Sequence, residues 1–197
     1  MTDEDIFRIA TIALTALVLP VGLYYRIRSQ ARGETIDRRP EGLFMLATLR
    51  PLGLLLFVSV VAYMINPRSM AWSSLPLADW IRCFGVVVAI VGAGLLVWTF
   101  RSIGTNITDT VVTRRNHVLV THGPYRWVRH PFYGSVALFV LGIAVTAANW
   151  FILLAGAAVM SLLVVRTRKE EENLVARFGD AYRGYMNSTG RFFPRRR

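Results

Sequence analysis

Five long apolar runs separated by polar loops are the feature that most restricts the fold of this chain. A helix needs about 20 apolar residues to cross the hydrocarbon of a bilayer. With 54% hydrophobic residues, the chain is also too apolar for an ordinary soluble domain. The sequence therefore predicts an all-α, polytopic membrane protein with five transmembrane helices, at Ile6–Tyr25, Leu43–Ile65, Ile81–Phe100, Phe132–Ala148 and Trp150–Val165.

Basic residues fall in alternate loops, and this pattern sets the predicted orientation. The net charge is +11, and arginines gather after the first run, after the third run and in the C-terminal tail. The N-terminus instead carries Asp3, Glu4 and Asp5, an acidic start that argues against a cleaved signal peptide. Because basic loops stay in the cytoplasm, we predict an N-terminus outside and a C-terminus inside. The expected location is the inner membrane of a bacterium or archaeon.

The basic loops also indicate the partners of the chain. Arginines between apolar runs are typical of cytoplasmic retention and of contact with anionic lipid. We therefore expect membrane lipid as a partner and no nucleic acid. The three histidines have no metal-ligand spacing, and no glycine-rich nucleotide loop or serine elbow is present. No metal is expected.

No repeat or internal boundary divides the chain, so residues 1–197 are predicted to form a single integral-membrane domain. Within it, residues 1–103 form a three-helix part, and residues 104–197 are expected to hold the site. The last two runs are joined by two or three residues, which requires a tight antiparallel helical hairpin. This hairpin brings its first residues back beside its last, so His130 should lie near Arg166.

A cytosolic amphipathic helix is expected after the hairpin. Apolar and aromatic residues recur there at helical spacing, at Leu174, Phe178, Tyr182 and Tyr185. In the second run, Arg50 beside Pro51 should face the bundle or extend to the interface, and it is a weak functional candidate.

The segment 117–134 is unusually rich in His, Arg and aromatic residues for a loop beside a span. Pro131 fits the first turn of a helix, where a missing amide costs nothing. That helix begins with free amide groups and a positive dipole end, which favour a carboxylate or phosphate. His130 precedes it, and Tyr125 and Tyr133 flank it. Taken singly, each of these residues also fits an ordinary structural role, as part of a helix cap or as an anchor at the membrane interface.

Glu170, Glu171 and Glu172 form an acidic cluster on the basic predicted cytoplasmic face. Three adjacent carboxylates repel one another, so they need counter-charges. These could come from Arg166 and its neighbours Arg168 and Lys169, or from a cationic ligand. Acidic residues in the first turn of a surface helix would be an ordinary alternative.

Two motifs and the hairpin between them resemble the isoprenylcysteine carboxyl methyltransferases. The first is the segment Gly123–Gly134, with the sequence GPYRWVRHPFYG. The second has the pattern EExxLxxxFGxxYxxY from Glu170 to Tyr185 and is followed by Arg191–Pro194. The resemblance covers about residues 104–194. It implies an integral-membrane methyltransferase that uses S-adenosyl-L-methionine at a cytoplasmic-side site, while a lipidic substrate enters between helices.

The resemblance also implies roles for individual residues. Arg166 would bind the substrate carboxylate and would be catalytic. Glu170 would accept hydrogen bonds from the cofactor. The residues expected to bind the cofactor are His117, Val118, Leu119, Val120, Tyr125, His130, Pro131, Phe132, Tyr133 and Glu170.

The chemistry of methyl transfer leaves the nucleophile open. A carboxylate is already ionised at neutral pH and needs no base, so alignment and exclusion of water would supply the catalysis. An amine would need a proton acceptor, for which Glu171 or His130 is available, and Glu171 is the second catalytic candidate.

The predicted activity is methylation of the carboxylate of an isoprenylcysteine-like or other lipidic substrate, either a small molecule or a prenylated chain. A phospholipid or amine N-methyltransferase is the alternative within the same class. A sterol-reductase-like, NADPH-dependent enzyme and a non-catalytic membrane adaptor are alternatives from other classes.

Overall fold

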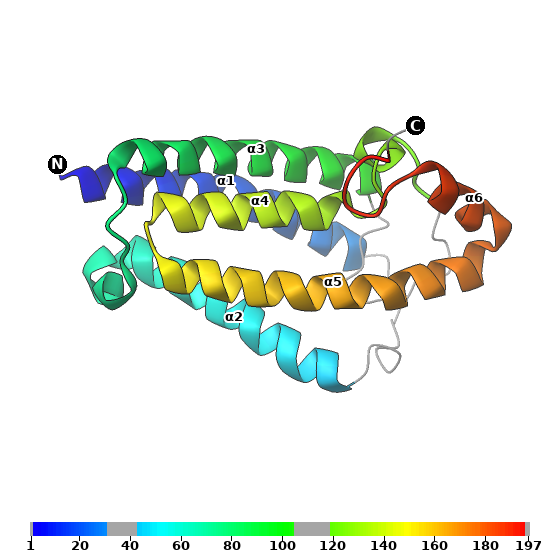
Figure 1. The fold of residues 1–197 in the computed structure, drawn as a ribbon, viewed down its shortest axis with the longest axis horizontal. Coiled ribbons are helices and arrows are strands. Elements are labelled where there is room, and N and C mark those ends of the chain that lie inside the picture. The colour runs from blue at the N-terminus through cyan, green and yellow to red at the C-terminus, as the bar shows by residue number, and fades with distance from the viewer. Residues whose placement is uncertain (1, 31–42, 105–118, 196–197) are drawn as a thin grey trace.

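The computed structural model describes residues 2–30, 43–104 and 119–195, and these residues form a bundle of long helices (Figure 1). Two short 3₁₀-helices lie between the long ones. The elements in chain order are α1 (Asp3–Gln30), α2 (Leu43–Ile65), η2 (Pro67–Ser73), α3 (Asp79–Ile103), η4 (Gly123–Arg126), α4 (Pro131–Thr146), α5 (Trp150–Phe178) and α6 (Asp180–Ser188).

Four of the described helices, α1, α2, α3 and α5, are long and apolar enough to cross a membrane. This supports the predicted all-α, polytopic membrane class. The fourth predicted span, Phe132–Ala148, corresponds to α4, which is apolar but has only 16 residues. It is short because Pro131 occupies its first turn and Ala148, just beyond its end, takes a positive φ of 46°. By length and composition, residues 2–30, 43–104 and 119–195 therefore contain four candidate spans and one shorter apolar helix.

Helix α4 lies against α3 along most of its length (Figure 1). Glycines allow this close packing, as small residues commonly do between membrane helices. A Cβ atom on Gly92 would overlap the backbone nitrogen of Phe139, and one on Gly142 would overlap that of Ala89. On the other side of the bundle, α2 packs against α5, so the α4–α5 hairpin joins the two layers.

The predicted hairpin between the last two helices is present, with its turn at residues 147–149. Asn149 stabilises the turn, because its side chain accepts a hydrogen bond from the amide of Ile152 over 3.0 Å. The same side chain donates to the Ser73 hydroxyl over 2.7 Å and so ties the turn to η2. The hairpin then returns the chain toward the beginning of α4.

Helix α5 is longer than the sequence predicts. We expected a span ending at Val165 and a separate amphipathic helix after it, but α5 continues without a break to Phe178. Nothing in residues 166–178 interrupts a helix, whereas Gly179 ends it with a positive φ of 55°. The acidic cluster therefore lies on the extension of a long helix. Of the four residues expected on the amphipathic helix, Leu174 and Phe178 lie in α5, whereas Tyr182 and Tyr185 lie in α6.

A buried arginine joins four helices at the end of the bundle opposite α6, and sequence reasoning did not single it out. The Arg82 guanidinium donates to the Thr146 carbonyl (3.0 Å), the Glu4 carboxylate (2.8 Å) and the Tyr63 hydroxyl (3.2 Å). It also lies 4.0 Å from the centre of the Phe7 ring. Arg50, by contrast, is exposed on α2, so it does not face the bundle.

Candidate active site

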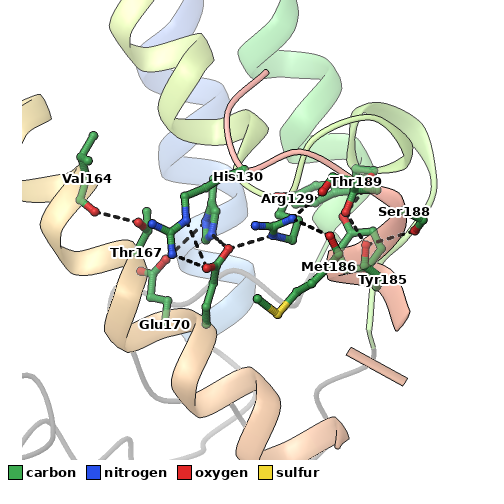
Figure 2. Close-up of polar contacts among 12 residues, drawn as sticks. Arg129, His130, Val164, Thr167, Glu170, Tyr185, Met186, Ser188 and Thr189 are labelled. Carbon is green, nitrogen blue, oxygen red and sulfur yellow. Dashed lines mark hydrogen bonds and ion pairs between the residues drawn. The ribbon is translucent and has the colours of Figure 1, made fainter. Parts of the chain in front are cut away.

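The candidate site lies at the open end of the α4–α5 hairpin, between the beginning of α4 and the extension of α5. Figure 2 shows His130 beside Glu170 of α5, and Arg129 between His130 and the residues Met186 and Thr189. The two polar motifs of the sequence, 41 residues apart, therefore meet in space. The predicted proximity of His130 and the acidic cluster follows from the return of the hairpin.

Glu170 is held by three side chains. The Tyr133 hydroxyl donates to one carboxylate oxygen over 2.6 Å, and Arg166 Nε donates to the same oxygen over 3.0 Å. His130 Nδ1 lies 3.7 Å from the other oxygen. Arg166 and Glu170 are one helical turn apart on α5, so this pair needs only local geometry.

Glu171 is more deeply buried, with 6% of its side chain exposed, and it is surrounded by donors. Arg129 Nε donates to one of its oxygens over 2.8 Å, and His130 Nε2 lies 3.2 Å from that oxygen. Arg191 donates to the other oxygen through Nε, over 3.1 Å, and also through Nη2. His130 thus lies between the two carboxylates, with one ring nitrogen facing each.

Among the described residues, three guanidinium groups face two carboxylates in this cluster. The hydrogen bond to Glu171 raises the pKa of Arg191 further above its ordinary value. The described part of the cluster is therefore rich in guanidinium groups, which favour an anionic ligand group.

Aromatic rings enclose His130. Its ring stacks nearly parallel to that of Tyr133, with centroids 5.6 Å apart and an interplanar angle of 11°. The Phe192 ring approaches from the C-terminal tail at 5.9 Å. Phe132 points to the bundle side, where its ring meets Phe100 at 5.5 Å.

Two tyrosines connect α6 to the loop before α4. The Tyr185 hydroxyl donates to the Tyr125 carbonyl over 2.6 Å. Burial raises the pKa of Tyr185 to about 12 and that of Tyr125 well above its ordinary value. Both phenols are therefore neutral hydrogen-bond donors over the physiological pH range.

The C-terminal segment 189–194, which we call the strap, pairs with the loop that carries His130. The amide of Arg129 donates to the Gly190 carbonyl over 2.8 Å, and the amide of His130 donates to the Arg191 carbonyl over 3.0 Å. In the other direction, the Gly190 amide donates to the Trp127 carbonyl over 3.3 Å. The strap thus forms one wall of the site.

The structure brings together five of the predicted site residues, Tyr133 and His130 from the beginning of α4 and Arg166, Glu170 and Glu171 from α5. Other predicted residues lie near this cluster in different ways. Pro131 is buried in the first turn of α4, and Tyr125 is buried in η4.

The remaining predicted cofactor residues lie upstream. Leu119 and Val120 are half-buried where the described loop begins, whereas His117 and Val118 lie outside the described residues.

The counter-charges of the acidic cluster were only partly predicted. Arg166 pairs with Glu170 as expected, but Lys169 pairs with the exposed Glu172. Sequence reasoning missed Arg129 and Arg191 as the partners of Glu171. Both lie in motifs of the resemblance, but nothing local to either residue indicates a partner 20 or 42 positions away.

Residues 85–176 match the model of the isoprenylcysteine carboxyl methyltransferase family. The chain is similar to the protein-S-isoprenylcysteine O-methyltransferase of Tribolium castaneum, with 30% identity over 128 residues, 58% of this chain and 42% of that protein. The human enzyme of the same name is 29% identical over 121 residues, 60% of this chain and 43% of its own length. Protein-S-isoprenylcysteine O-methyltransferase A of Arabidopsis thaliana is 30% identical over 118 residues, which are 58% of this chain and 60% of that protein.

The chain thus spans about half the length of the curated relatives it matches. A solved structure of the eukaryotic intramembrane Ras methyltransferase, an isoprenylcysteine carboxyl methyltransferase, superposes with a TM-score of 0.52 at 20% identity. The superposition covers 94% of this chain and 67% of that one, and it shows that the fold is shared.

The segment that matches the family model runs from α3 to the extension of α5. It includes Arg129, His130 and Tyr133 as well as Arg166, Glu170 and Glu171, so most of the polar cluster lies within it. The match to the isoprenylcysteine carboxyl methyltransferase family and most of the polar cluster therefore coincide in residues 85–176.

Proposed function

We propose that this chain is an S-adenosylmethionine-dependent methyltransferase of the membrane, which methylates the carboxylate of an isoprenylcysteine-like or other lipidic substrate. The observation that carries the proposal is a cluster of three residues between the beginning of α4 and the extension of α5. They are His130 before α4, and Arg166 and Glu170 on α5. This cluster lies inside the segment that matches the methyltransferase family.

The donors and acceptors of the cluster fit the cofactor. S-adenosylmethionine carries ribose hydroxyl groups, an ammonium group and a carboxylate, so it needs both acceptors and donors. Glu170 offers the carboxylate oxygen that accepts from neither Tyr133 nor Arg166, and His130 Nδ1, 3.7 Å from that oxygen, offers a polar contact. When bound, the cofactor would supply an electrophilic methyl group on a sulfonium sulfur.

The three guanidinium groups described in the cluster favour a carboxylate over an amine as the substrate group. An amine would also need a proton acceptor, and both oxygens of Glu171 already accept from Arg129, His130 and Arg191. A carboxylate needs no base, so Glu171 serves the reaction as the centre of a fixed ion-pair network.

Arg166 would hold the substrate carboxylate. Guanidinium groups bind carboxylates through two parallel hydrogen bonds, and Glu170 fixes the direction of this guanidinium through Nε. The partial burial of Arg166, whose side chain is 10% exposed, keeps water from competing for the ion pair. Catalysis then comes from alignment in a site of low water content.

The membrane arrangement belongs to the same proposal. We propose that α4 spans the bilayer as the fourth of five transmembrane helices, with the N-terminus outside and the site facing the cytoplasm of a bacterium or archaeon. Residues 1–103 would support the cofactor-binding part, residues 104–197. Single cysteines replacing Ser74 and Arg168, in a Cys83→Ser background, should react with an impermeant reagent from outside and inside, respectively. The reverse pattern would overturn this orientation.

Calorimetric titration of S-adenosylmethionine into purified protein tests the activity, with NADPH as the control for the reductase alternative. Saturable binding of the former alone is expected. Transfer of a labelled methyl group should then occur to N-acetyl-S-farnesylcysteine and not to its amide. Transfer to phosphatidylethanolamine instead would favour the N-methyltransferase alternative, and binding of NADPH alone would refute the proposal.

A further inference from the structure

The strap contacts the candidate site through both its backbone and its side chains. Two backbone hydrogen bonds join it to Arg129 and His130, and the Phe192 ring contacts the His130 ring. Arg129 in turn donates from its guanidinium to the carbonyls of Met186 and Thr189 (Figure 2). The loop before α4 and the end of the chain therefore form one hydrogen-bonded unit.

We propose that Arg191 is a positioning residue, which docks the strap on Glu171 and thereby holds His130 in the geometry that binds the cofactor. The inference rests on the proposed function, because it assigns a role within that site. Arg191 acts through Glu171 and through its own backbone carbonyl, and it does not contact the substrate group itself.

The hydrogen bonds of Glu171 divide cleanly between its two oxygens. One oxygen receives Arg129 and His130, and the other receives the two Arg191 donors and no further partner among the described residues. Loss of Arg191 would therefore leave one oxygen of this carboxylate without its donors, which a local reorientation of the side chain would relieve. Glu171 would turn toward another donor and so leave His130.

The position of Arg191 suits a docking residue and not a core residue. Its side chain is 33% exposed, whereas that of Glu171 is 6% exposed. Replacement of Arg191 removes a contact at the rim of the site and leaves the packing of α3, α4 and α5 intact. The effect should therefore appear in ligand affinity and in local backbone exchange, with little change in the melting temperature of the bundle.

The test compares three variants in detergent-purified full-length chain. Arg191→Gln should raise the Kd for S-adenosylmethionine by about tenfold or more, and Arg191→Lys should recover part of the loss because it keeps the charge. Arg195→Gln is the matched control, since Arg195 is an exposed strap-proximal arginine that donates to the Asn187 carbonyl and not to Glu171. It should bind like the wild type.

Hydrogen exchange without ligand gives a second, independent readout. The amides of Arg129, His130 and Gly190 should exchange faster in Arg191→Gln, while amides in the middle of α3 and α4 should not change. Faster exchange with unchanged affinity would show that strap docking does not serve the site, and unchanged exchange would show that Arg191 does not dock the strap. Either result overturns the inference. A large drop in melting temperature that accompanies the loss of affinity would indicate a structural role and would also overturn the inference.

The inference and the proposed function fail in different ways. A folded wild-type protein that does not bind S-adenosylmethionine would refute both. Wild-type binding together with full affinity in Arg191→Gln would refute the role of Arg191 alone and leave the methyltransferase proposal standing.

Discussion

His130 and Glu171, 41 residues apart in the sequence, lie with Nε2 and a carboxylate oxygen 3.2 Å apart. This contact joins the beginning of α4 to the extension of α5, and the same histidine faces Glu170 with its other ring nitrogen at 3.7 Å. One imidazole therefore connects the two acidic residues on which the candidate site depends. Variants that alter either carboxylate should affect ligand binding more than folding.

Glu170→Ala should abolish binding of S-adenosylmethionine while the protein stays folded. The change removes the acceptor that holds the Tyr133 hydroxyl and Arg166. Calorimetry measures the affinity, and circular dichroism checks the helix content. Glu172→Ala is the control, because Glu172 is exposed and pairs only with Lys169 among the described residues. Undiminished affinity in Glu170→Ala would remove Glu170 from the site.

Arg166→Ala should spare cofactor binding and lower kcat. A hydrogen bond to a charged group is worth about 1.5–3 kcal/mol, which corresponds to roughly a 10- to 100-fold loss of turnover. Labelled-methyl transfer at saturating cofactor measures the effect, and Arg168→Ala, an exposed neighbour on the same helix, serves as the control. Equal losses of cofactor affinity and turnover would contradict a role toward the substrate.

Gly142→Ala should destabilise the bundle. The added Cβ would overlap the backbone of Ala89 on α3, and overpacking of this kind costs about 1–3 kcal/mol. Gly94→Ala adds the same atom at a position with no other atom within 4 Å and should leave the melting temperature in detergent unchanged or slightly higher. Similar melting temperatures for both variants would show that α3 and α4 do not pack this closely.

Arg82→Met should lower thermal stability without affecting the candidate site, which lies at the other end of the bundle. The change removes the ion pair with Glu4 and leaves the Thr146 carbonyl without its guanidinium donor, at a cost of about 1–3 kcal/mol for the unsatisfied carbonyl. Thermal unfolding with and without S-adenosylmethionine separates the two effects. Arg68→Met, an exposed position, should match the wild type.

Alkaline pH should weaken the docking of α6. Burial raises the pKa of Tyr185 to about 12 from an ordinary value of 10.0. The unfolded chain therefore loses this proton first, and stability that is fully present below pH 10 falls as the pH rises toward 12. Tyr185→Phe should show a shallower decline in melting temperature over this range. A decline as steep as that of the wild type would assign the effect to other groups.

The sequence by itself determined the helical membrane class and the meeting of the two motifs. Apolar runs and a two- or three-residue turn are local properties, and they suffice to fold Pro131–Thr146 back against Trp150–Phe178. That return places His130 near Arg166 and the acidic cluster whatever the rest of the bundle does. The roles of the motif residues came from family resemblance and stay predictions.

Only the tertiary structure decided which charges meet. Arg129 and Arg191 reach Glu171 from 42 and 20 residues away, and Arg82 reaches Glu4 across 78 residues. Such pairs depend on the relative positions of several packed helices and on the path of the strap, which no local pattern encodes. The same holds for α4, since close packing of glycine surfaces against α3, and not hydropathy alone, places this short helix in the bundle.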